Sequence, residues 1–241
     1  MKSIEILNLS KTYFSKFVLQ DITWDIPAGS ISALIGLNGS GKTTLLRILA
    51  GLIKPTNGDA RIFSEEVTNF HSIKGTSFMF EPSPIDNMLT AYQNLKLKCL
   101  IMGEPLGTIN QLISMVGLKR SNVLVKNYSI GMKKRLELAY SLIGNPDLLI
   151  LDEPFDGLDI TGVEMLKNIL LDYKNSEKTV LITEHNFSLL EDITDHFAIL
   201  YDRKIIASLS QNEITNKFGN LETAFKEIIN QYDKSVEIRT K

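Results

Sequence analysis

The octapeptide GLNGSGKT, residues 36–43, has the residue types and spacing of a phosphate-binding loop. Its glycines let backbone N–H groups surround phosphate oxygens, and the helical pattern that follows adds the positive end of a helix dipole. A plain structural turn would need neither the lysine nor the threonine. We therefore predict that Lys42 reaches the β- and γ-phosphates of a nucleotide and that the Thr43 hydroxyl binds Mg²⁺. The candidates for phosphate contact are consecutive: Gly36, Leu37, Asn38, Gly39, Ser40, Gly41, Lys42, Thr43 and Thr44.

Two carboxylates end the apolar run LLILDEP, residues 148–154. Asp152 at the end of the run suits a Mg²⁺ ligand that acts through water. Glu153 suits a base that orients or deprotonates an attacking water. Pro154 disfavours helical geometry at Glu153, so the two side chains should diverge. The alternative is that Asp152 and Glu153 are two ordinary acids at a strand end. The phosphate loop in the same chain argues against this alternative.

A histidine ends a third apolar run, LITEH, residues 181–185. A neutral imidazole at this place can hydrogen-bond a γ-phosphate or the attacking water. His71 and His196 have no comparable setting, so we expect them at the surface or in packing roles. All three clusters follow apolar runs, and the carboxyl ends of parallel strands share one edge of a sheet. We therefore predict one site that contains Lys42, Glu153 and His185 as its catalytic residues.

A second helix start, YSIGMKKR at residues 128–135, has an unusual charge distribution. Ser129 is a good helix cap and Gly131 allows close approach of a ligand. The basic residues Lys133, Lys134 and Arg135 occupy the first turn, where the helix dipole disfavours cations. An anion at the cap would relieve this misfit. The alternative is that the three basic side chains extend into solvent.

The elements that position these residues alternate between strands and helices. Strand patterns occur at 3–9, 17–26, 30–35, 75–80, 147–153 and 178–184, and helical patterns at 42–53, 90–103, 108–118 and 132–144. Unbroken apolar strands favour a parallel sheet covered on both faces. We predict an α/β fold: a P-loop nucleoside triphosphatase (NTPase) core with a mainly parallel sheet, an N-terminal antiparallel β subdomain and an inserted helical subdomain. The core would comprise about 1–81 and 146–210, the helical subdomain about 82–145, and a polar tail with one amphipathic stretch, LETAFKEII, about 211–241.

Composition restricts the setting of the protein. The formal net charge of −2 gives no general basic signal for nucleic acid. Cys99 is the only cysteine, which excludes an intramolecular disulfide and fits a reducing compartment. No apolar run is long enough to span a bilayer, and the N-terminus does not read as a signal peptide. We expect a cytoplasmic protein that reaches a membrane only through a partner, with Cys99 and Trp24 in the core.

The ordered set of motifs resembles the nucleotide-binding subunit of ATP-binding cassette (ABC) transporters over nearly the whole chain. YSIGM stands where the family has Leu-Ser-Gly-Gly-Gln, and FDGLD, residues 155–159, supplies the dimer-facing Asp159. The resemblance implies ATP and Mg²⁺ as ligands, Tyr13 stacked on adenine, and His185 as the switch histidine. It also implies two cassettes arranged head to tail, in which Ser129 and Gly131 contact the γ-phosphate in the partner's site. Such an arrangement would explain two phosphate-binding helix starts in one chain.

The departures from the family pattern are also informative. Ile130 replaces the first glycine of the signature, and Met132 replaces its glutamine. Glu81, in FMFEP, stands where the family usually has glutamine; a carboxylate there can bind Mg²⁺ more strongly than an amide. A subgroup resembling bacitracin and lantibiotic exporters has similar Glu-Pro and Tyr-Ser-x-Gly-Met patterns, which favours export.

The resemblance implies an ATPase subunit that powers a separate integral membrane permease from the cytoplasmic face of the membrane. Both an identical and a different chain fit as the second cassette, and no nucleic acid partner is expected. A soluble cassette acting on ribosomes or nucleic acid is the alternative, although the long insertions and paired cassettes of such relatives are missing from the sequence. A GTPase is a third reading, but its base-reading motif would have to be TNKFG, residues 215–219, where Gly219 replaces the required aspartate.

Overall fold

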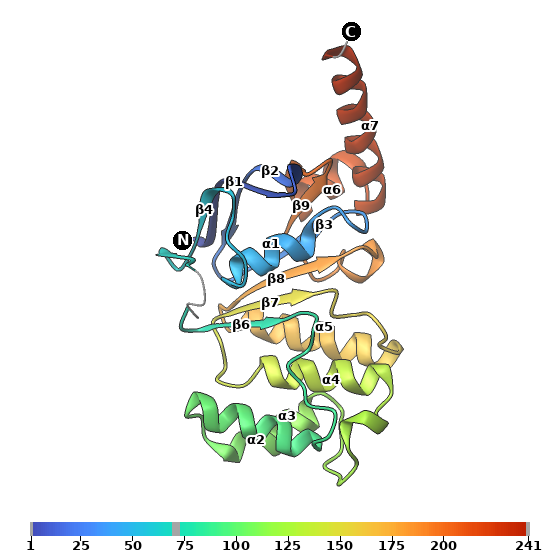
Figure 1. The fold of residues 1–241 in the computed structure, drawn as a ribbon. Coiled ribbons are helices and arrows are strands. Elements are labelled where there is room, and N and C mark those ends of the chain that lie inside the picture. The colour runs from blue at the N-terminus through green and yellow to red at the C-terminus, as the bar shows by residue number, and fades with distance from the viewer. Residues whose placement is uncertain (1, 69–72, 240–241) are drawn as a thin grey trace.

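Two β-sheets and the helices around them form the protein (Figure 1). The computed structural model describes residues 2–68 and 73–239. His71, for which a surface or packing role is predicted, lies outside the described residues. None of the helices in these two ranges combines the length and apolar character that crossing a bilayer requires.

The smaller sheet is antiparallel and contains the N-terminus, as the sequence predicts. Its strand order is β2-β1-β4-β5. The strands are β1 (Lys2–Tyr13), β2 (Lys16–Pro27), β4 (Asn57–Ile62) and β5 (Glu65–Glu66). Ile22, Trp24 and Ile26 alternate with exposed residues along β2, so one face of this sheet is buried. The burial of Trp24 confirms its predicted packing role.

The larger sheet has the order β10-β9-β3-β8-β7-β6. Its strands are β3 (Ile31–Ile35), β6 (Thr76–Met79), β7 (Leu148–Asp152), β8 (Thr179–Glu184), β9 (His196–Tyr201) and β10 (Lys204–Ser210). Neighbours from β9 to β6 run parallel, and only β10 is antiparallel to its neighbour. The carboxyl ends of β3, β7 and β8 therefore meet at one edge.

Both faces of this sheet are buried, which explains why its strands are apolar at successive positions. Leu181 of β8 faces the cluster that contains α1 and the N-terminal sheet, whereas Val180 and Ile182 face the cluster that contains α4 and α5. The helices are α1 (Lys42–Leu49), α2 (Ala91–Met102), α3 (Ile109–Met115), α4 (Ile130–Ser141), α5 (Ile160–Asn175), α6 (Gln211–Phe218) and α7 (Leu221–Arg239), with 3-10 turns at Leu106–Thr108, Val125–Asn127 and Phe187–Leu189.

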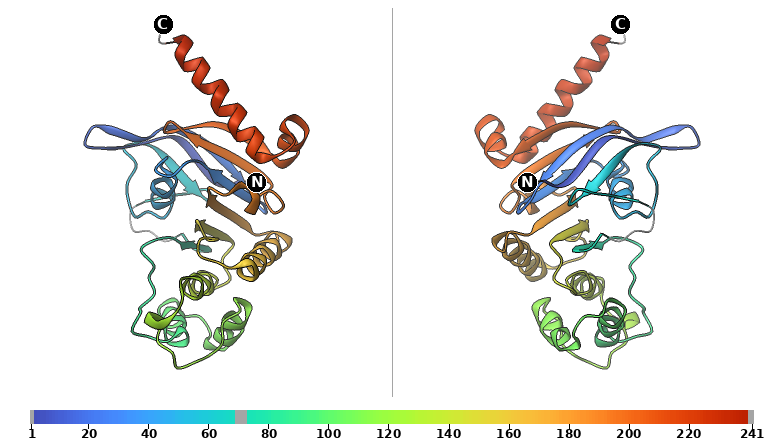
Figure 2. Two further views of the ribbon diagram at one scale, coloured as in Figure 1. Left: turned by 90° about the vertical axis from the view of Figure 1, so that its right-hand side faces the viewer. Right: turned by 90° about the vertical axis from the view of Figure 1, so that its left-hand side faces the viewer.

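Helices α2, α3 and α4 follow β6 and precede β7, and α2 and α3 lie at the end of the molecule opposite α7 (Figures 1 and 2). Cys99 of α2 is fully buried, as predicted. Thr90 begins α2 with a capping box: its hydroxyl accepts from Gln93 N, and the Gln93 side chain accepts from Thr90 N. These local bonds fix where the helical segment starts.

The structure confirms the fold class and corrects several element boundaries. The predicted helix 42–53 ends at Leu49, because Gly51 adopts a positive φ of 67° and the chain leaves the helical path. The tail, predicted as polar with one amphipathic stretch, forms α6 and the 19-residue α7, which contains that stretch. The capping box of Ser210 and Glu213 starts α6. The strands β4, β5, β9 and β10 were not expected from the sequence.

Candidate nucleotide-binding and catalytic site

The phosphate loop connects the carboxyl end of β3 to α1. A Cβ on Gly36 would lie 2.5 Å from Leu200 O, so only glycine fits there. Gly41 caps α1 with φ 112°, a conformation that side chains disfavour. Lys42 is buried, and its Nζ donates to Gly36 O at 2.9 Å and to Leu37 O at 3.4 Å. The lysine thus crosses the loop that the glycines shape, next to the N-terminus of α1.

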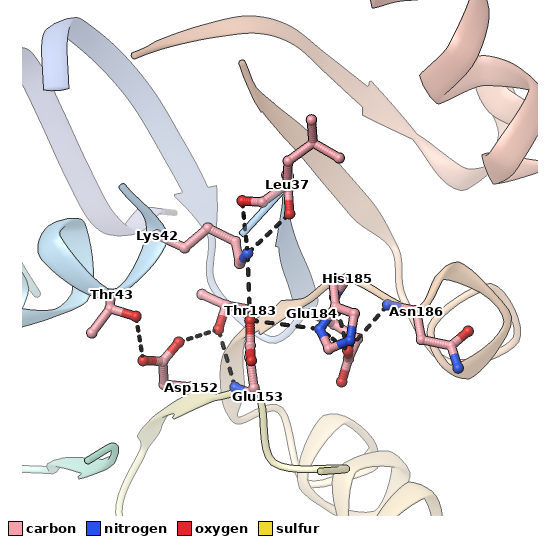
Figure 3. Close-up of polar contacts among 10 residues, drawn as sticks. Leu37, Lys42, Thr43, Asp152, Glu153, Thr183, Glu184, His185 and Asn186 are labelled. Carbon is pink, nitrogen blue, oxygen red and sulfur yellow. Dashed lines mark hydrogen bonds and ion pairs between the residues drawn. The ribbon is translucent and has the colours of Figure 1, made fainter. Parts of the chain in front are cut away.

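Three oxygen-bearing side chains from α1, β7 and β8 form a chain of hydrogen bonds beside this loop (Figure 3). Thr43 Oγ1 donates to Asp152 Oδ2 at 2.8 Å. Thr183 Oγ1 donates to the other oxygen, Asp152 Oδ1. Hydroxyl and carboxylate oxygens are the protein ligands that Mg²⁺ prefers. The pair Thr43 and Asp152 therefore fits the predicted magnesium site in both donor chemistry and mutual distance.

Glu153 is the residue with the least favourable backbone at this edge. Its φ of 44° lies in the left-handed region, which non-glycine residues rarely adopt and which often marks functional sites. Its N–H donates to Thr183 Oγ1 at 3.1 Å and to Thr183 O at 3.2 Å. This conformation lies outside the right-handed helical region, but it is not the extended backbone that a following proline favours. The predicted divergence of the Asp152 and Glu153 side chains stays a prediction.

The Glu153 carboxylate links the phosphate loop to the end of β8. Glu153 Oε1 lies 3.4 Å from Lys42 Nζ and 3.6 Å from His185 Nδ1. His185 Nδ1 lies 3.2 Å from Glu184 Oε1. The structure thus brings together the three residues that the sequence predicts as catalytic. The Glu153 carboxylate lies between the Lys42 ammonium group and the His185 imidazole (Figure 3).

The second predicted helix start forms a separate open cavity at the N-terminus of α4. Ser129 is the N-cap, and its Oγ accepts from Met132 N at 3.2 Å. A Cβ on Gly131 would lie 2.9 Å from Gly157 O, which explains the need for glycine. Ser129, Gly131 and Asp159 all line this cavity. None of the hydrogen bonds or ion pairs among the described residues joins these three residues to the phosphate loop.

Arg135 shows that the basic first turn of α4 has an acidic partner within the chain. Its Nη2 lies 2.8 Å from Asp159 Oδ1, and its side chain is only 16% exposed. Asp159 also caps α5 by accepting from Gly162 N at 2.8 Å. These two bonds hold the pKa of Asp159 below its usual value. The idea that all three basic side chains extend into solvent is therefore wrong for Arg135.

Two further predicted ligand residues lie at the margin of the site. Tyr13, at the tip of the β1–β2 hairpin, is 42% exposed, with Lys11 Nζ 4.9 Å from its ring centroid. Glu81 is exposed just after β6, and its carbonyl oxygen accepts from Arg47 Nη2 at 3.0 Å. No hydrogen bond in the described part of the chain joins its carboxylate to Thr43 or Asp152. Both assignments stay predictions.

Comparison with known proteins identifies the family. The family model described as "ABC transporter" matches residues 19–156. The chain belongs to the ABC transporter family. The lantibiotic transport ATP-binding protein SrtF of Streptococcus pyogenes is 38% identical over 204 residues, which cover 84% of this chain and 89% of SrtF. The bacitracin transport ATP-binding protein BcrA of Bacillus licheniformis is 35% identical, with 86% of this chain and 69% of BcrA covered.

A solved structure of the ATP-binding subunit of an ABC transporter superposes with a TM-score of 0.83 at 26% identity, over 94% of this chain and 99% of that one. The comparisons confirm the predicted resemblance to ABC transporter ATP-binding subunits, and with it the similarity to lantibiotic and bacitracin transport proteins.

Two residues of this ABC transporter chain were missed by the motif analysis: Thr183 and Glu184. Thr183 contacts both Asp152 and Glu153 N, and Glu184 contacts the backbone of the residues after β8. Thr183 and Glu184 lie inside the run LITEH, so a polar pair before the histidine was the available signal. Arg135 was recognised as misplaced, but nothing in the sequence indicates that Asp159 is its partner.

Proposed function

We propose that this chain is the ATP-binding and ATP-hydrolysing subunit of an exporter, and that association of two cassettes powers a separate membrane permease. The observation that carries the ATPase assignment is the arrangement at the sheet edge. Lys42, Glu153 and His185 lie in contact there, and Thr43 binds Asp152 beside them. In an ABC transporter chain this arrangement supports phosphoryl transfer to water.

Each residue at the edge has a distinct role in this proposal. Lys42 and the loop 36–44 bind the phosphates, and Tyr13 stacks on the adenine. Glu153 orients the attacking water and accepts its proton. When phosphate arrives, Lys42 Nζ has a stronger anionic partner than Glu153 Oε1, which now lies 3.4 Å away. The release of Glu153 from Lys42 therefore accompanies nucleotide binding.

Thr43 and Asp152, with Glu81 as a predicted third ligand, would hold Mg²⁺ in the loaded enzyme. The ion would neutralise charge on the β- and γ-phosphate oxygens. Thr183 holds Asp152 from the side opposite Thr43, which fixes the carboxylate before any ligand binds. His185 contacts the γ-phosphate from the end of β8.

A second cassette completes the site. Ser129 and Gly131 lie in an open cavity that is separate from the loop of their own chain. Ile130 and Ile160, 75% and 80% exposed, flank this surface and would be covered by a partner. We infer that Ser129, Gly131 and Asp159 face nucleotide bound to the partner's phosphate loop. The α4 helix dipole then acts on the γ-phosphate.

The permease is proposed to contact the helical segment between β6 and β7. Helix α2 exposes Leu97, Leu100 and Ile101 at 50%, 60% and 75%. A groove beside α2 continues to the edge strand β6 and includes Ile101 and Phe78. Exposed apolar side chains next to a groove are typical of a protein interface. The segment 82–94 leads from Glu81 to α2, so it links the site to this surface. We place the subunit at the cytoplasmic face of the membrane.

The ATPase proposal is tested with Glu153→Gln. This variant should bind ATP with near-normal affinity and lose at least about 100-fold in turnover, because the amide does not accept the proton. It should also accumulate as an ATP-bound dimer, measured by size-exclusion chromatography with light scattering. Glu227→Gln on the exposed face of α7 is the matched control and should behave as wild type. Normal turnover of Glu153→Gln would exclude Glu153 as the base.

The transporter assignment is tested by isolating the intact complex from membranes of the native host. A multi-span membrane protein should copurify, and Ile101→Glu on the exposed α2 surface should release it without lowering ATP affinity. Copurification with ribosomes instead would support the alternative of a soluble cassette.

A further inference from the structure

Glu184 is a buried acid at the end of β8, directly before the catalytic edge. Successive residues of a strand point to opposite faces, so Thr183 and Glu184 diverge. Thr183 reaches Asp152, whereas the Glu184 side chain is only 1% exposed, on the opposite face. Acidic side chains are rarely buried to this degree without a specific partner.

One oxygen of this carboxylate makes three contacts with the next two residues. Glu184 Oε1 accepts from His185 N at 2.8 Å and from Asn186 N at 3.1 Å. It also lies 3.2 Å from His185 Nδ1 (Figure 3). The same oxygen therefore binds both the backbone that carries the imidazole and the imidazole ring itself.

These contacts determine which nitrogen of His185 carries the proton in the neutral ring. A lone pair on Nδ1 would face the oxygens of Glu184 and Glu153, at 3.2 and 3.6 Å. A proton on Nδ1 replaces this repulsion with attraction to the two oxygens, so electrostatics favours the neutral tautomer with its proton on Nδ1. Nε2 is then the nitrogen that meets a ligand.

Burial of the Glu184 carboxyl lowers the stability of the fold, which indicates that packing alone does not explain an acid at this position. Glu184 Oε2 is buried and has no hydrogen-bond partner among the described residues. Burial raises the pKa of Glu184 although its two backbone hydrogen bonds oppose the shift. A buried, half-satisfied carboxyl lowers stability unless its other oxygen binds water. An apolar side chain at this position would avoid that cost.

We propose that Glu184 is a positioning residue that fixes the tautomer and orientation of His185 for contact with the γ-phosphate. The inference rests on the proposed role of His185 in ATP hydrolysis. Glu184 does not touch the nucleotide in this account; it acts on hydrolysis only through the His185 ring, which it contacts directly and whose backbone it holds.

The orientation is tested by NMR of the imidazole nitrogens in the nucleotide-free protein. The chain has only three histidines, so His185→Ala assigns the relevant signal. At about pH 8.5, above the usual imidazole pKa, the neutral wild-type ring should be the Nδ1–H tautomer. Glu184→Met, which has no acceptor, should lose this tautomer, and Glu184→Gln, which keeps an amide oxygen, should retain it. An Nε2–H tautomer in the wild type would overturn the proposal without any variant.

The catalytic consequence is tested with a double-mutant cycle in the full-length protein. Glu184→Met should lower kcat about 10- to 100-fold, by analogy with the loss when the outer partner of a metal-binding histidine is removed, with KM for ATP within about twofold. Glu184→Gln should restore most of kcat. In the His185→Ala background, Glu184→Met should have no further effect, because Glu184 acts only through the ring. An equal additional loss in that background would overturn the proposal.

The NMR experiment and the kinetic experiment distinguish failure of this inference from failure of the proposed function. If His185→Ala leaves turnover unchanged, the proposed role of His185 fails, but the NMR signal still decides whether Glu184 sets the tautomer. If Glu184→Met does not fold, judged by ATP affinity and circular dichroism, Glu184→Ser replaces it, because a serine hydroxyl is too short to reach Nδ1. Wild-type tautomer and turnover in Glu184→Ser would then refute the inference.

Discussion

Lys98 connects the proposed permease surface on α2 to α4, the helix that begins at Ser129. The structure gives the expected change in folding stability when Lys98 is replaced. Lys98 Nζ donates to Tyr140 O at 2.7 Å and lies 4.3 Å from the Tyr140 ring centroid. Burial lowers the pKa of Lys98 from 10.5 to about 8. The contact therefore holds an ammonium group in an environment that disfavours its charge.

The sign of the effect on stability follows from this direction. Between about pH 8 and 10.5 the unfolded chain binds more protons at Lys98 than the folded chain, so folding becomes more favourable as pH rises. Below pH 8 the shift destabilises the folded state by roughly 3 kcal/mol, and at pH 9.5 by only about 1.5 kcal/mol. Lys98→Met removes this dependence. At pH 7.0, where the lysine is charged, the variant also loses the hydrogen bond and the cation–π contact, about 1–2 kcal/mol together.

Urea unfolding of wild type and Lys98→Met at pH 7.0 and 9.5 measures the difference. The variant should be at least as stable as wild type at pH 7.0, and the wild type should gain roughly 2 kcal/mol relative to the variant by pH 9.5. Lys96→Met removes an exposed lysine from the same helix and should show no such relative change. Parallel stability curves for wild type and Lys98→Met would refute the idea that burial of the ammonium sets its pKa.

Two further predictions concern the nucleotide site. Thr43→Ala removes the hydroxyl that binds Asp152 Oδ2. ATP affinity measured with Mg²⁺ should therefore fall about tenfold or more, whereas ATP affinity measured with EDTA should change little. Equal losses of affinity in both conditions would contradict a metal-binding role of Thr43. Gly157→Ala places a Cβ 2.5 Å from Ile130 Cγ2, at a backbone φ of 75° that side chains disfavour. Turnover and melting temperature should both fall. Adding Ile130→Gly should restore part of the loss, because it removes the clash with the new Cβ. No rescue by Ile130→Gly would show that backbone strain at Gly157, rather than the contact with Ile130, dominates.

The chemistry of the site was predictable where it depends on sequence spacing. Lys42 and Thr43 follow the glycines of one loop, and Asp152 and Glu153 end one strand, so chain connectivity fixes their neighbourhood. The shared edge followed from the parallel sheet, because β3, β7 and β8 are adjacent and run in the same direction. Local rules were sufficient for these residues.

Contacts between distant segments were not predictable in the same way. Thr183 meets Asp152 because β8 pairs with β7 in a register that places the two side by side, and strand pairing cannot be read from one strand. Arg135 meets Asp159 because α4 and the start of α5 lie side by side, although 24 positions separate the two residues. Likewise, α1 ends at Leu49 because Gly51 leaves the helix, while the apolar periodicity of the sequence continues to residue 53.

The N-terminus of α4 supports the proposal that the site is shared between two chains. Arg135 is neutralised by Asp159, so its charge does not need an external anion. The first N–H groups of α4 differ from Arg135, because Ser129 Oγ caps only Met132 N. An open cavity is lined by Ser129, Ile130 and Gly131. The phosphate loop of the same chain satisfies its own lysine with Gly36 O, Leu37 O and Glu153. In the proposed arrangement, the open cavity at the N-terminus of α4 receives the phosphate of a nucleotide that another molecule binds. Hydrolysis that depends on both halves would then require association, which gives a permease a mechanical step to exploit.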